Sequence, residues 1–534
     1  MDDSSKIPDH LVAGIDLGSN SFKLMIARVQ EHGGTFHLQE IDTIKSTVRL
    51  ANGLDEKNKL DDETINKALN TLMRFGDRIQ NFPKKNVCVI ATNTFRVAKN
   101  AKFLIEEGEK LLGFPIKVIS GEDEARLVFT GAEHVSPICD SNRFVIDIGG
   151  SSTELIVGKS DKIETYDSLQ LGCVTSSRKF FNDGIYNQKN LDAAIAESAK
   201  IIRMVSSRYL KLSWDQVVGS SGTCRAIADI ISANHLNDNP VLPVSDLGGV
   251  ITRDGLEAIK SELIKFKNIT DLKISGLKSD RKPVIGGGLA VLIAIFEEFK
   301  IKSMEVSESA IIYGALHEAI INKIEKKGYK YIGSNKKIRP VNKNDKKIDR
   351  RAQEVFEWAE QFKVDKIQSY RMIDFCNVLY KKVNQEKNYN YKNSKKILEW
   401  ACLLHEIGLV INYRQYQMHS SYIISNKELT AFSKNDQARL ASLVLCHRGR
   451  LDKFNLSSCY IDWGLLITLR LSFIFFKKRM DIEIPEIRIR EEDGKIIIVI
   501  EEAWINKYPF IKFGITKESL SLEKTQTNFR IILE

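Results

Sequence analysis

Two stretches of this chain are written on one template. They run from Val12 to Val29 and from Phe144 to Gly158, and each reads as a short apolar strand, a tight turn and a second apolar strand. A single turn of this kind is typical of an ordinary hairpin, but two copies predict two similar half-domains that face each other across a cleft. The matched positions are Asp16 with Asp147, Gly18 with Gly149, Ser21 with Ser152 and Leu24 with Leu155.

The composition of the two turns points to phosphate. Glycine lets the backbone approach an anion closely because it carries no Cβ. The N–H groups of such a turn, with the hydroxyls beside them, form a concave anion-binding site. An Asp at a strand end, such as Asp16 or Asp147, can also hold a divalent cation against phosphate oxygens.

The periodicity of the chain changes twice. From Val12 to about residue 320, strand-like runs alternate with helical patterns, which predicts α/β organisation in two repeats. Helical patterns follow, and alternation around Asp493-Gly494 then predicts a hairpin. The expected domains are a first α/β half (1–135), a second α/β half (136–322), a basic linker (323–344), a helical domain (345–483) and a small β-containing domain (484–534).

The net charge of +10 suggests a polyanionic partner. Between Lys323 and Arg351, twelve Lys or Arg residues stand against three acids. We expect a long anionic substrate to run along this stretch. Neutralising Lys336, Lys337 and Arg339 should therefore weaken the binding of long anionic substrates more than that of short ones. The chain has no aromatic-and-basic motif of the usual single-strand type, so nucleic acid is not an expected partner.

Other features concern location and assembly. Eight cysteines are scattered without a Cys-x-x-Cys pair, which favours reduced, buried thiols in a cytoplasmic protein. The polar N-terminus does not resemble a signal peptide. The most apolar run, Trp463 to Phe476, carries Arg470 and is too short to span a bilayer, so we expect a buried helix. A homodimer is the expected assembly, although no residue pattern sets it.

Charged residues near two predicted helix starts are candidates for chemistry. Glu122, Asp123 and Glu124 follow the strand that ends near Ser120. Acids in a first helical turn often balance only the helix dipole, but one of them could reach the cleft as a general base, and spacing leaves the choice open. Arg96 could bind phosphate bidentately, with a surface ion pair as the alternative.

Two glycine-rich segments are expected to form walls of the second half-domain. The segments Val217 to Ile230 and Val284 to Phe296 each read as a strand, a glycine turn and an apolar helix. The strand expected for the second segment is the run from Arg281 to Gly288. Close helix–strand packing explains such glycines as well as ligand contact does.

Four motifs in order, IDLGSNSFKL, ISGEDEARL, VIDIGGSSTEL and LHEIGL, closely resemble the exopolyphosphatase / guanosine pentaphosphate phosphohydrolase (Ppx/GppA) family. This family lies within the actin, hexokinase and acetate kinase superfamily. The resemblance implies two actin/acetate-kinase-like (ribonuclease H-like) half-domains around a cleft. An all-helical HD-like domain and a small β-containing C-terminal domain would follow.

The resemblance also implies roles for single residues. Glu124 would activate the attacking water, and Asp147 and Glu154 would associate with Mg²⁺. At one loop position the family usually has glycine where this chain has Ser151, which adds a hydroxyl and restricts the backbone. The implied phosphate-binding loop residues are Gly18, Ser19, Asn20, Ser21, Gly149, Gly150, Ser151 and Ser152.

The helical domain departs from a metal-binding HD site, which needs an adjacent His-Asp pair with a further His and Asp. This chain has His405-Glu406, and Gln368 stands where the first His would fall. His419 and His447 are more typical of packing or surface positions than of metal ligands. We expect a structural domain that forms a wall for substrate.

These observations predict a magnesium-dependent exopolyphosphatase that removes terminal phosphates from inorganic polyphosphate. The alternative is a guanosine pentaphosphate 5′-phosphohydrolase, which makes the same cut on a nucleotide, and one protein could do both. From other classes, a kinase could use glycine turns at Gly219 to Gly222 and Gly286 to Gly288 as an adenosine pocket. A non-catalytic nucleotide-binding module would use the positive charge without Glu124.

Overall fold

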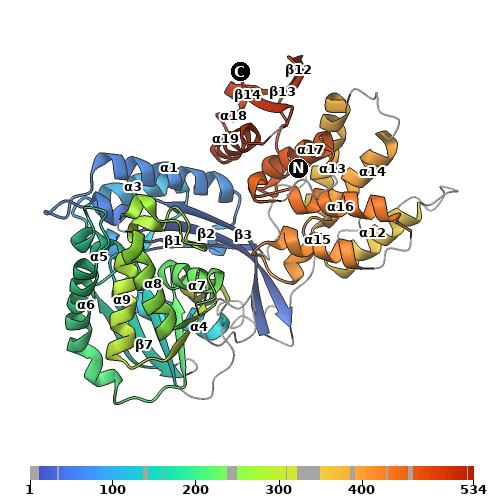
Figure 1. The fold of residues 1–534 in the computed structure, drawn as a ribbon. Helices are drawn as coiled ribbons and strands as arrows, with labels where there is room; N and C mark the ends of the chain where they lie inside the picture. The colour runs from blue at the N-terminus through green and yellow to red at the C-terminus, as the bar shows by residue number, and fades with distance from the viewer. Residues whose placement is uncertain are drawn as a thin grey trace. The chain divides into compact units, whose positions relative to one another are not determined.

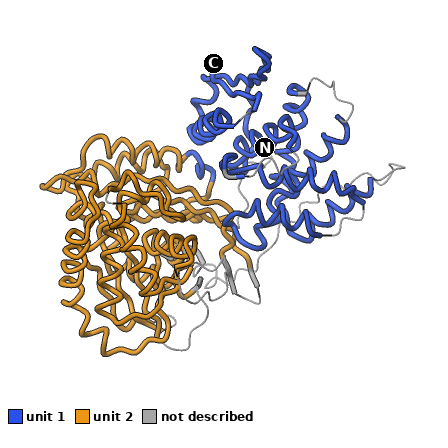
Figure 2. The backbone as a smooth tube through the Cα atoms, in the orientation of Figure 1, with its two compact units in different colours: residues 1–9, 77–81, 331–534 blue, residues 10–76, 82–330 orange. Residues whose placement is uncertain are grey.

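A computed structural model describes most of the chain, in two units (Figure 2). Unit 2 comprises His10–Gly76 and Phe82–Lys330, and unit 1 comprises Met1–Asp9, Asp77–Asn81 and Tyr331–Glu534. The basic stretch predicted to guide long anions lies almost wholly outside the described residues, as do Lys336, Lys337 and Arg339. The described residues are 11–32, 35–135, 142–159, 162–236, 249–266, 268–307, 310–321, 349–384, 391–427, 431–454, 461–525 and 527–534.

Unit 2 begins with a five-stranded sheet in the order β3-β2-β1-β4-β5. The first template stretch forms the antiparallel pair β1–β2, and β4 runs parallel to β1. The turn that carries Gly18 therefore lies at the end of a buried strand. The strands are β1 (Leu11–Leu17), β2 (Ser21–His32), β3 (Thr35–Thr47), β4 (Val87–Ala91) and β5 (Lys117–Val118).

The second sheet of unit 2 repeats this arrangement, in the order β10-β11-β9-β6-β7-β8. The second template stretch forms the antiparallel pair β6–β7, and β9 runs parallel to β6 as β4 does to β1. The structure confirms the predicted fold class of two similar half-domains. The strands are β6 (Arg143–Ile148), β7 (Thr153–Lys159), β8 (Lys162–Leu169), β9 (Gln216–Ser220), β10 (Val250–Thr252) and β11 (Ser303–Ser307).

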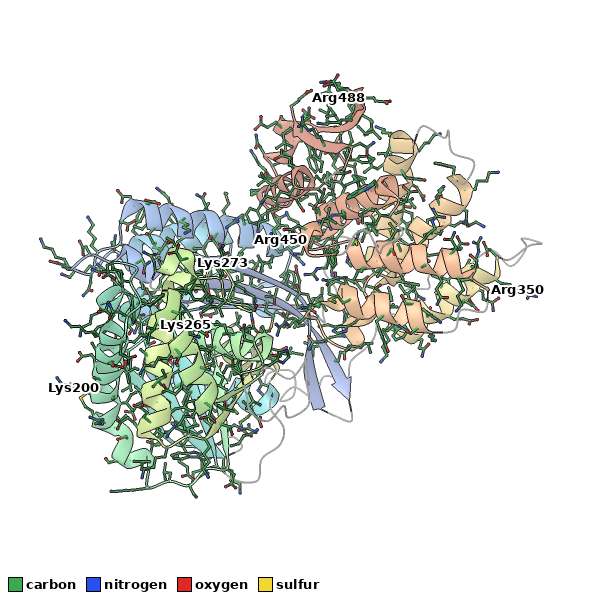
Figure 3. The ribbon with its side chains drawn as sticks, viewed as in Figure 1. Lys200, Lys265, Lys273, Arg350, Arg450 and Arg488 are labelled. Atoms are coloured by element: carbon green, nitrogen blue, oxygen red, sulfur yellow. The ribbon has the colours of Figure 1, made fainter. Side chains whose placement is uncertain are left out.

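Helices pack on both sheets, and α6 and α9 lie side by side (Figure 1). Their apolar residues recur at three- and four-residue steps, as in α1, where Ala68, Leu72 and Phe75 are buried. Charged residues cover the outer faces, for example Lys200 on α6 and Lys265 on α8 (Figure 3). The helices are α1 (Asp62–Ile79), α2 (Asn93–Val97), α3 (Ala101–Leu112), α4 (Gly121–Val135), α5 (Cys173–Phe180), α6 (Gln188–Tyr209), α7 (Gly222–Ala233), α8 (Arg253–Phe266), α9 (Ile285–Glu298) and α10 (Ala310–Leu316).

The segment from Arg281 to Gly288 corrects one prediction. It is not a strand: residues Lys282–Val284 form a short 3₁₀ turn, and Gly286 to Gly288 lie inside α9. A Cβ at Gly286 would lie 2.3 Å from the ring of Tyr186, and one at Gly288 would lie 2.5 Å from Thr223. These glycines allow close packing of a buried helix, so they do not form a turn or an adenosine pocket.

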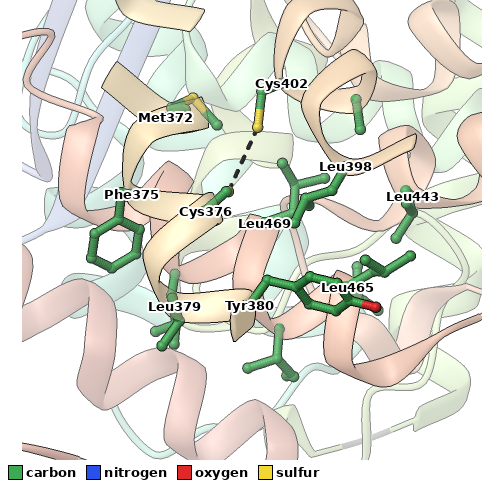
Figure 4. Close-up of a cluster of buried hydrophobic side chains, with 14 of the residues drawn as sticks. Met372, Phe375, Cys376, Leu379, Tyr380, Leu398, Cys402, Leu443, Leu465 and Leu469 are labelled. Atoms are coloured by element: carbon green, nitrogen blue, oxygen red, sulfur yellow. Dashed lines mark hydrogen bonds between the residues drawn. The ribbon is translucent and has the colours of Figure 1, made fainter. Parts of the chain in front are cut away.

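Unit 1 is mainly helical. Its core is one large apolar cluster, part of which appears in Figure 4, where Phe375 and Tyr380 of α13 lie among leucines from neighbouring helices. Cys376 and Cys402 meet there with their sulfur atoms 3.6 Å apart. The helices are α12 (Arg350–Gln361), α13 (Lys366–Asn384), α14 (Tyr391–Leu404), α15 (Tyr416–Asn426), α16 (Lys434–Cys446) and α17 (Trp463–Phe476).

The C-terminal part of unit 1 contains the predicted hairpin. Strands β12 (Ile487–Glu492) and β13 (Lys495–Ile500) are joined by Asp493 and Gly494, which both have positive φ, as a tight two-residue hairpin turn requires. The sequence analysis did not predict α18 (Glu502–Ile505), α19 (Pro509–Glu523) or β14 (Phe529–Leu533), which pairs in parallel with β13.

Helix α17 is buried, as predicted. Its Arg470 is 3% exposed and forms a bidentate ion pair with Glu518 of α19, at 2.5 and 2.6 Å. The Arg470 guanidinium also donates to the carbonyl of Gly449. Across the described ranges, no helix is long and apolar enough to cross a membrane.

Candidate active site

The two glycine loops are placed equivalently by the two strand pairs. In the register of β1 and β2, Asp16 lies opposite Lys23, and in that of β6 and β7, Asp147 lies opposite Glu154. A Cβ at Gly18 would lie 3.1 Å from the carbonyl oxygen of Ser21, and one at Gly149 would lie 3.1 Å from that of Ser152. Both turns are therefore tight, as the shared template predicts.

The two loops meet. A Cβ at Gly150 would lie 3.0 Å from Ser19 Cβ and 3.1 Å from the backbone nitrogen of Asn20. The Oγ atoms of Ser19 and Ser151 are 2.8 Å apart. The loops of the two half-domains are thus in direct contact.

Four carboxylates lie together beside the loops: those of Glu124 and Glu154 are buried, and those of Asp16 and Asp147 are half-buried. Burial, with the nearby charge of Glu124, raises the pKa of Asp16 to about 7, and Lys23 opposes this shift. Burial, with the charges of Glu124 and Asp16, raises the pKa of Asp147 well above its ordinary value. The pKa of Glu154 is raised in the same direction by burial and by the charges of Glu124 and Asp147. Glu124 therefore lies within electrostatic reach of the other three acids, and Asp147 lies within reach of Asp16 and Glu154.

Two carboxylate oxygens of this cluster could still accept a hydrogen bond or bind a cation. Asp16 Oδ1 and Glu154 Oε2 are buried and have no hydrogen-bond partner among the described residues. Buried carboxylate oxygens of this kind are costly unless a cation or donor meets them. The donor set is all oxygen, which Mg²⁺ prefers.

The acids that open α4 have different surroundings. Glu122 is exposed, and Asp123 pairs with Arg126 at 2.8 Å. Glu124 is 6% exposed and accepts a 2.8 Å hydrogen bond from Arg96, which also donates to the carbonyl of Ile119. Burial raises the pKa of Glu124, and the charge of Arg96 opposes this. Arg96 therefore lies beside the carboxylate cluster, in contact with Glu124.

A group of basic side chains extends from Lys23, whose charge acts on Asp16. Lys23 lies opposite Lys45 in the register of β2 and β3. Burial lowers the pKa of Lys23, and the charge of Arg225 lowers it further. Burial also lowers the pKa of Lys45 to about 8, together with the charges of Arg281, Lys278 and Lys23, while Asp280 opposes the shift. We call Lys23, Lys45, Arg225, Lys278 and Arg281 the basic group.

The basic group was not predicted from the sequence as part of the site. Thr94 and Asn93, whose side chains hydrogen-bond to Ser19 and Ser151, were not predicted either. Lys23 had a detectable signal, because it occupies the position in the first template that Glu154 occupies in the second. Arg225 and Arg281 had none, because their place depends on tertiary packing: the guanidinium of Arg281 lies against Gly222, where a Cβ would be 1.8 Å from its Nη2.

In the helical unit, His405 and His447 lie with their ring centres 5.1 Å apart. Burial lowers the pKa of both imidazoles, and each Nδ1 pairs with a backbone carbonyl. Gln368 donates to the carbonyl of Phe476, and Glu406 pairs with Arg479. Among the described residues of the chain, no three His, Cys, Asp or Glu side chains are spaced to hold a metal ion together.

Comparison with known proteins agrees with this architecture. Residues 25–323 match the model of the Ppx/GppA phosphatase family, and residues 350–519 match Ppx/GppA phosphatase, domain III. A protein of Pseudoalteromonas translucida named guanosine-5′-triphosphate,3′-diphosphate pyrophosphatase is 33% identical over 96% of both chains. A protein of the same name from Pseudoalteromonas atlantica is 31% identical over 97% of this chain and 96% of its own.

Solved structures show the same fold. An exopolyphosphatase-like protein aligns with a TM-score of 0.51 and 25% identity, over 59% of this chain and 98% of its own. An exopolyphosphatase from Cytophaga hutchinsonii aligns over the same shares with a TM-score of 0.51 and 20% identity. The chain is thus a hydrolase of phosphoanhydride bonds and belongs to the Ppx/GppA phosphatase family.

Proposed function

We propose that this enzyme removes the 5′-terminal phosphate of guanosine pentaphosphate. The observation that carries the proposal is the near full-length similarity to two relatives named for this nucleotide. Polyphosphate was the first expectation from the sequence, and the relatives favour the nucleotide alternative over it. Exopolyphosphatase activity is the second candidate, because a solved structure of the same fold, 25% identical, is exopolyphosphatase-like.

The basic group supports a substrate with more than one phosphate cluster. Guanosine pentaphosphate carries a 5′-triphosphate and a 3′-diphosphate. The carboxylate cluster and the two loops would receive the terminal phosphate of the first. Lys45, Arg281 and their neighbours would offset the charge of the remaining phosphates, because cationic side chains near a phosphate chain both attract and orient it.

In the proposed reaction, Glu124 is the general base. It takes a proton from water as the water oxygen bonds to the terminal phosphorus, and the bond between that phosphorus and the bridging oxygen breaks. The products are orthophosphate and guanosine tetraphosphate. Burial supports this role, because it raises the pKa of Glu124 and so makes the carboxylate a stronger base. Glu122 is exposed, and the hydrogen bond from Arg126 lowers the pKa of Asp123, so neither acid shares this environment.

The loops and Arg96 position the phosphate. Backbone N–H groups of Gly18 to Ser21 and of Gly150 to Ser152 would bind its oxygens, as glycine turns do in other phosphate sites, whereas the Gly149 N–H already donates to the carbonyl of Ser152. Arg96 would hold Glu124 in place and add positive charge. Such a site supplies mainly position and charge, because the transferred phosphoryl group is loosely bonded in the transition state.

Asp147 and Glu154 are the residues proposed to hold Mg²⁺. Mg²⁺ commonly uses only one or two carboxylates and keeps several waters, so the lack of a three-ligand group among the described residues is compatible with it. When bound, the ion would neutralise charge on the phosphate oxygens.

Asp147→Asn is expected to raise the Mg²⁺ concentration for half-maximal activity by about 10–100-fold, because the neutral amide is a weaker ligand than a carboxylate. Titration of Mg²⁺ against initial rate measures this. Unchanged Mg²⁺ demand in the variant, or full turnover of the wild type in chelator, would contradict the assignment.

The pH dependence of substrate affinity should report on Lys45. Its pKa of about 8 means that it is charged below pH 8 and neutral above it. Because anionic substrate prefers the charged form, KM should rise by up to about tenfold for a pH unit above 8. Lys45→Arg stays charged and should flatten this rise. Identical profiles for the two proteins would remove Lys45 from substrate binding.

The products test the function directly. Guanosine pentaphosphate incubated with the enzyme should give orthophosphate and guanosine tetraphosphate in equal amounts by ³¹P NMR. Release of pyrophosphate, or intact nucleotide after long incubation, would contradict the proposal.

A further inference from the structure

A chain of hydrogen-bonded side chains joins the two phosphate loops. Thr94 Oγ1 donates to Ser19 Oγ at 2.7 Å, and Ser19 Oγ lies 2.8 Å from Ser151 Oγ. Ser151 Oγ donates to Asn93 Oδ1 at 2.9 Å. All four side chains are at most 6% exposed. Two members belong to the loops, and two belong to the start of α2.

Donors and acceptors along this row of hydrogen-bonded side chains can be assigned in one direction only. Each hydroxyl has a single proton. Since Ser151 gives its proton to the Asn93 carbonyl oxygen, Ser19 must donate to Ser151, and Thr94 supplies the bond to Ser19. The Asn93 amide group is oriented by its own contact with Gln170, at 3.4 Å. The hydroxyl protons of Thr94, Ser19 and Ser151 are therefore all used in hydrogen bonds within this network.

The backbone N–H groups of the loops, unlike the hydroxyls, do not take part in this network. The carbonyl of Ser19 accepts from Ala51 N–H at 3.0 Å, and the carbonyl of Gly150 accepts from Val174 N–H at 2.7 Å. Across a trans peptide the next N–H points the opposite way, so the N–H groups of Asn20 and Ser151 point away from these partners. They remain suited to an anion, whereas the hydroxyls are engaged with each other.

We propose that the Thr94–Ser19–Ser151–Asn93 chain is a latch that holds the two loops together for one phosphate group. Ser151 is then a positioning residue that acts through Ser19, and its hydroxyl does not bind phosphate. The latch orders the loops before substrate binds, so it should affect substrate affinity more than the rate of the chemical step. This inference rests on the proposed function for its substrate but not for its geometry.

A double-mutant cycle tests the latch. Ser151→Ala and Ser19→Ala both remove the Ser19–Ser151 link together with one neighbouring bond of the same network. Because either change separates the two loops, each should raise KM for guanosine pentaphosphate about fivefold, with a smaller change in kcat. The double variant should show about the same fivefold loss, because members of one network are not additive. Thr94→Val should raise KM in the same direction through Ser19.

Two hydroxyls that bound phosphate independently would instead give about a 25-fold loss in the double variant, and that result would overturn the latch. Unchanged KM in both single variants would overturn it as well. Ser176→Ala is the matched control, because this buried hydroxyl has no hydrogen-bond partner among the described residues. It should leave KM unchanged.

Failure of the proposed function has a different signature. The same cycle can be measured as binding of inorganic tripolyphosphate by calorimetry, which needs no nucleotide turnover. A wild type that does not cleave guanosine pentaphosphate, but shows the non-additive loss of tripolyphosphate affinity, would end the proposed function and keep the latch. Additive losses of affinity would end the latch whichever substrate the enzyme cleaves.

Discussion

Glu124→Gln is expected to lower kcat for guanosine pentaphosphate by about 10²–10⁴-fold, with little change in KM. The amide keeps the shape of the side chain and can still accept the hydrogen bond from Arg96, but it is far too weak a base to take the proton of the attacking water. Steady-state phosphate release measures both constants, and the expected split identifies a group that acts in the chemical step.

Glu122→Gln is the matched control, because Glu122 is exposed two residues away. It should retain near wild-type kcat. Turnover of Glu124→Gln within a few-fold of wild type would remove Glu124 from the mechanism and make Asp123 the next candidate.

Glu518→Ala should lower the free energy of unfolding of unit 1 by about 3–5 kcal/mol, because it leaves the buried guanidinium of Arg470 without its carboxylate. The remaining carbonyl partners of Arg470 at Cys446 and Gly449 cannot neutralise its charge. Urea denaturation followed by tryptophan fluorescence suits the measurement. Four of the five tryptophans lie in unit 1, at positions 358, 400, 463 and 504.

Glu523→Ala is the control, since Glu523 is exposed on the same helix and should change the unfolding free energy by less than about 0.5 kcal/mol. The double replacement Arg470→Met with Glu518→Leu should recover most of the loss, because it removes both charges together. A Glu518→Ala variant as stable as the Glu523→Ala control would show that water reaches the guanidinium.

Local and repeated patterns were readable from the sequence. The duplicated strand–turn–strand template predicted the β1–β2 and β6–β7 pairs because each is a short-range unit with its own turn residues. The Asp493-Gly494 turn was predictable for the same reason, since it needs positive φ at two adjacent residues.

Features that depend on distant neighbours were not readable. Gly286 to Gly288 looked like a turn, but Tyr186 and Thr223 occupy the space beside them and favour a closely packed helix. The link from Ser151 to Asn93 joins residues 58 positions apart. The pairing of Arg470 with Glu518 likewise spans 48 positions.

The sequence identified these acids as candidates but did not show their environments. Glu122, Asp123 and Glu124 are equivalent by spacing, and only the fold shows that Glu124 alone is buried beside the Asp16 and Asp147 carboxylates. Their roles in the reaction stay predictions, as do the domain boundaries proposed at residues 135/136, 322/323, 344/345 and 483/484.

The most direct test of the central proposal compares kcat/KM for guanosine pentaphosphate and for long-chain polyphosphate, measured as phosphate release by the same wild-type enzyme with Mg²⁺. We expect a higher kcat/KM for guanosine pentaphosphate and loss of both activities in Glu124→Gln. Efficient cleavage of polyphosphate with guanosine pentaphosphate left intact would contradict it and restore the exopolyphosphatase as the better description.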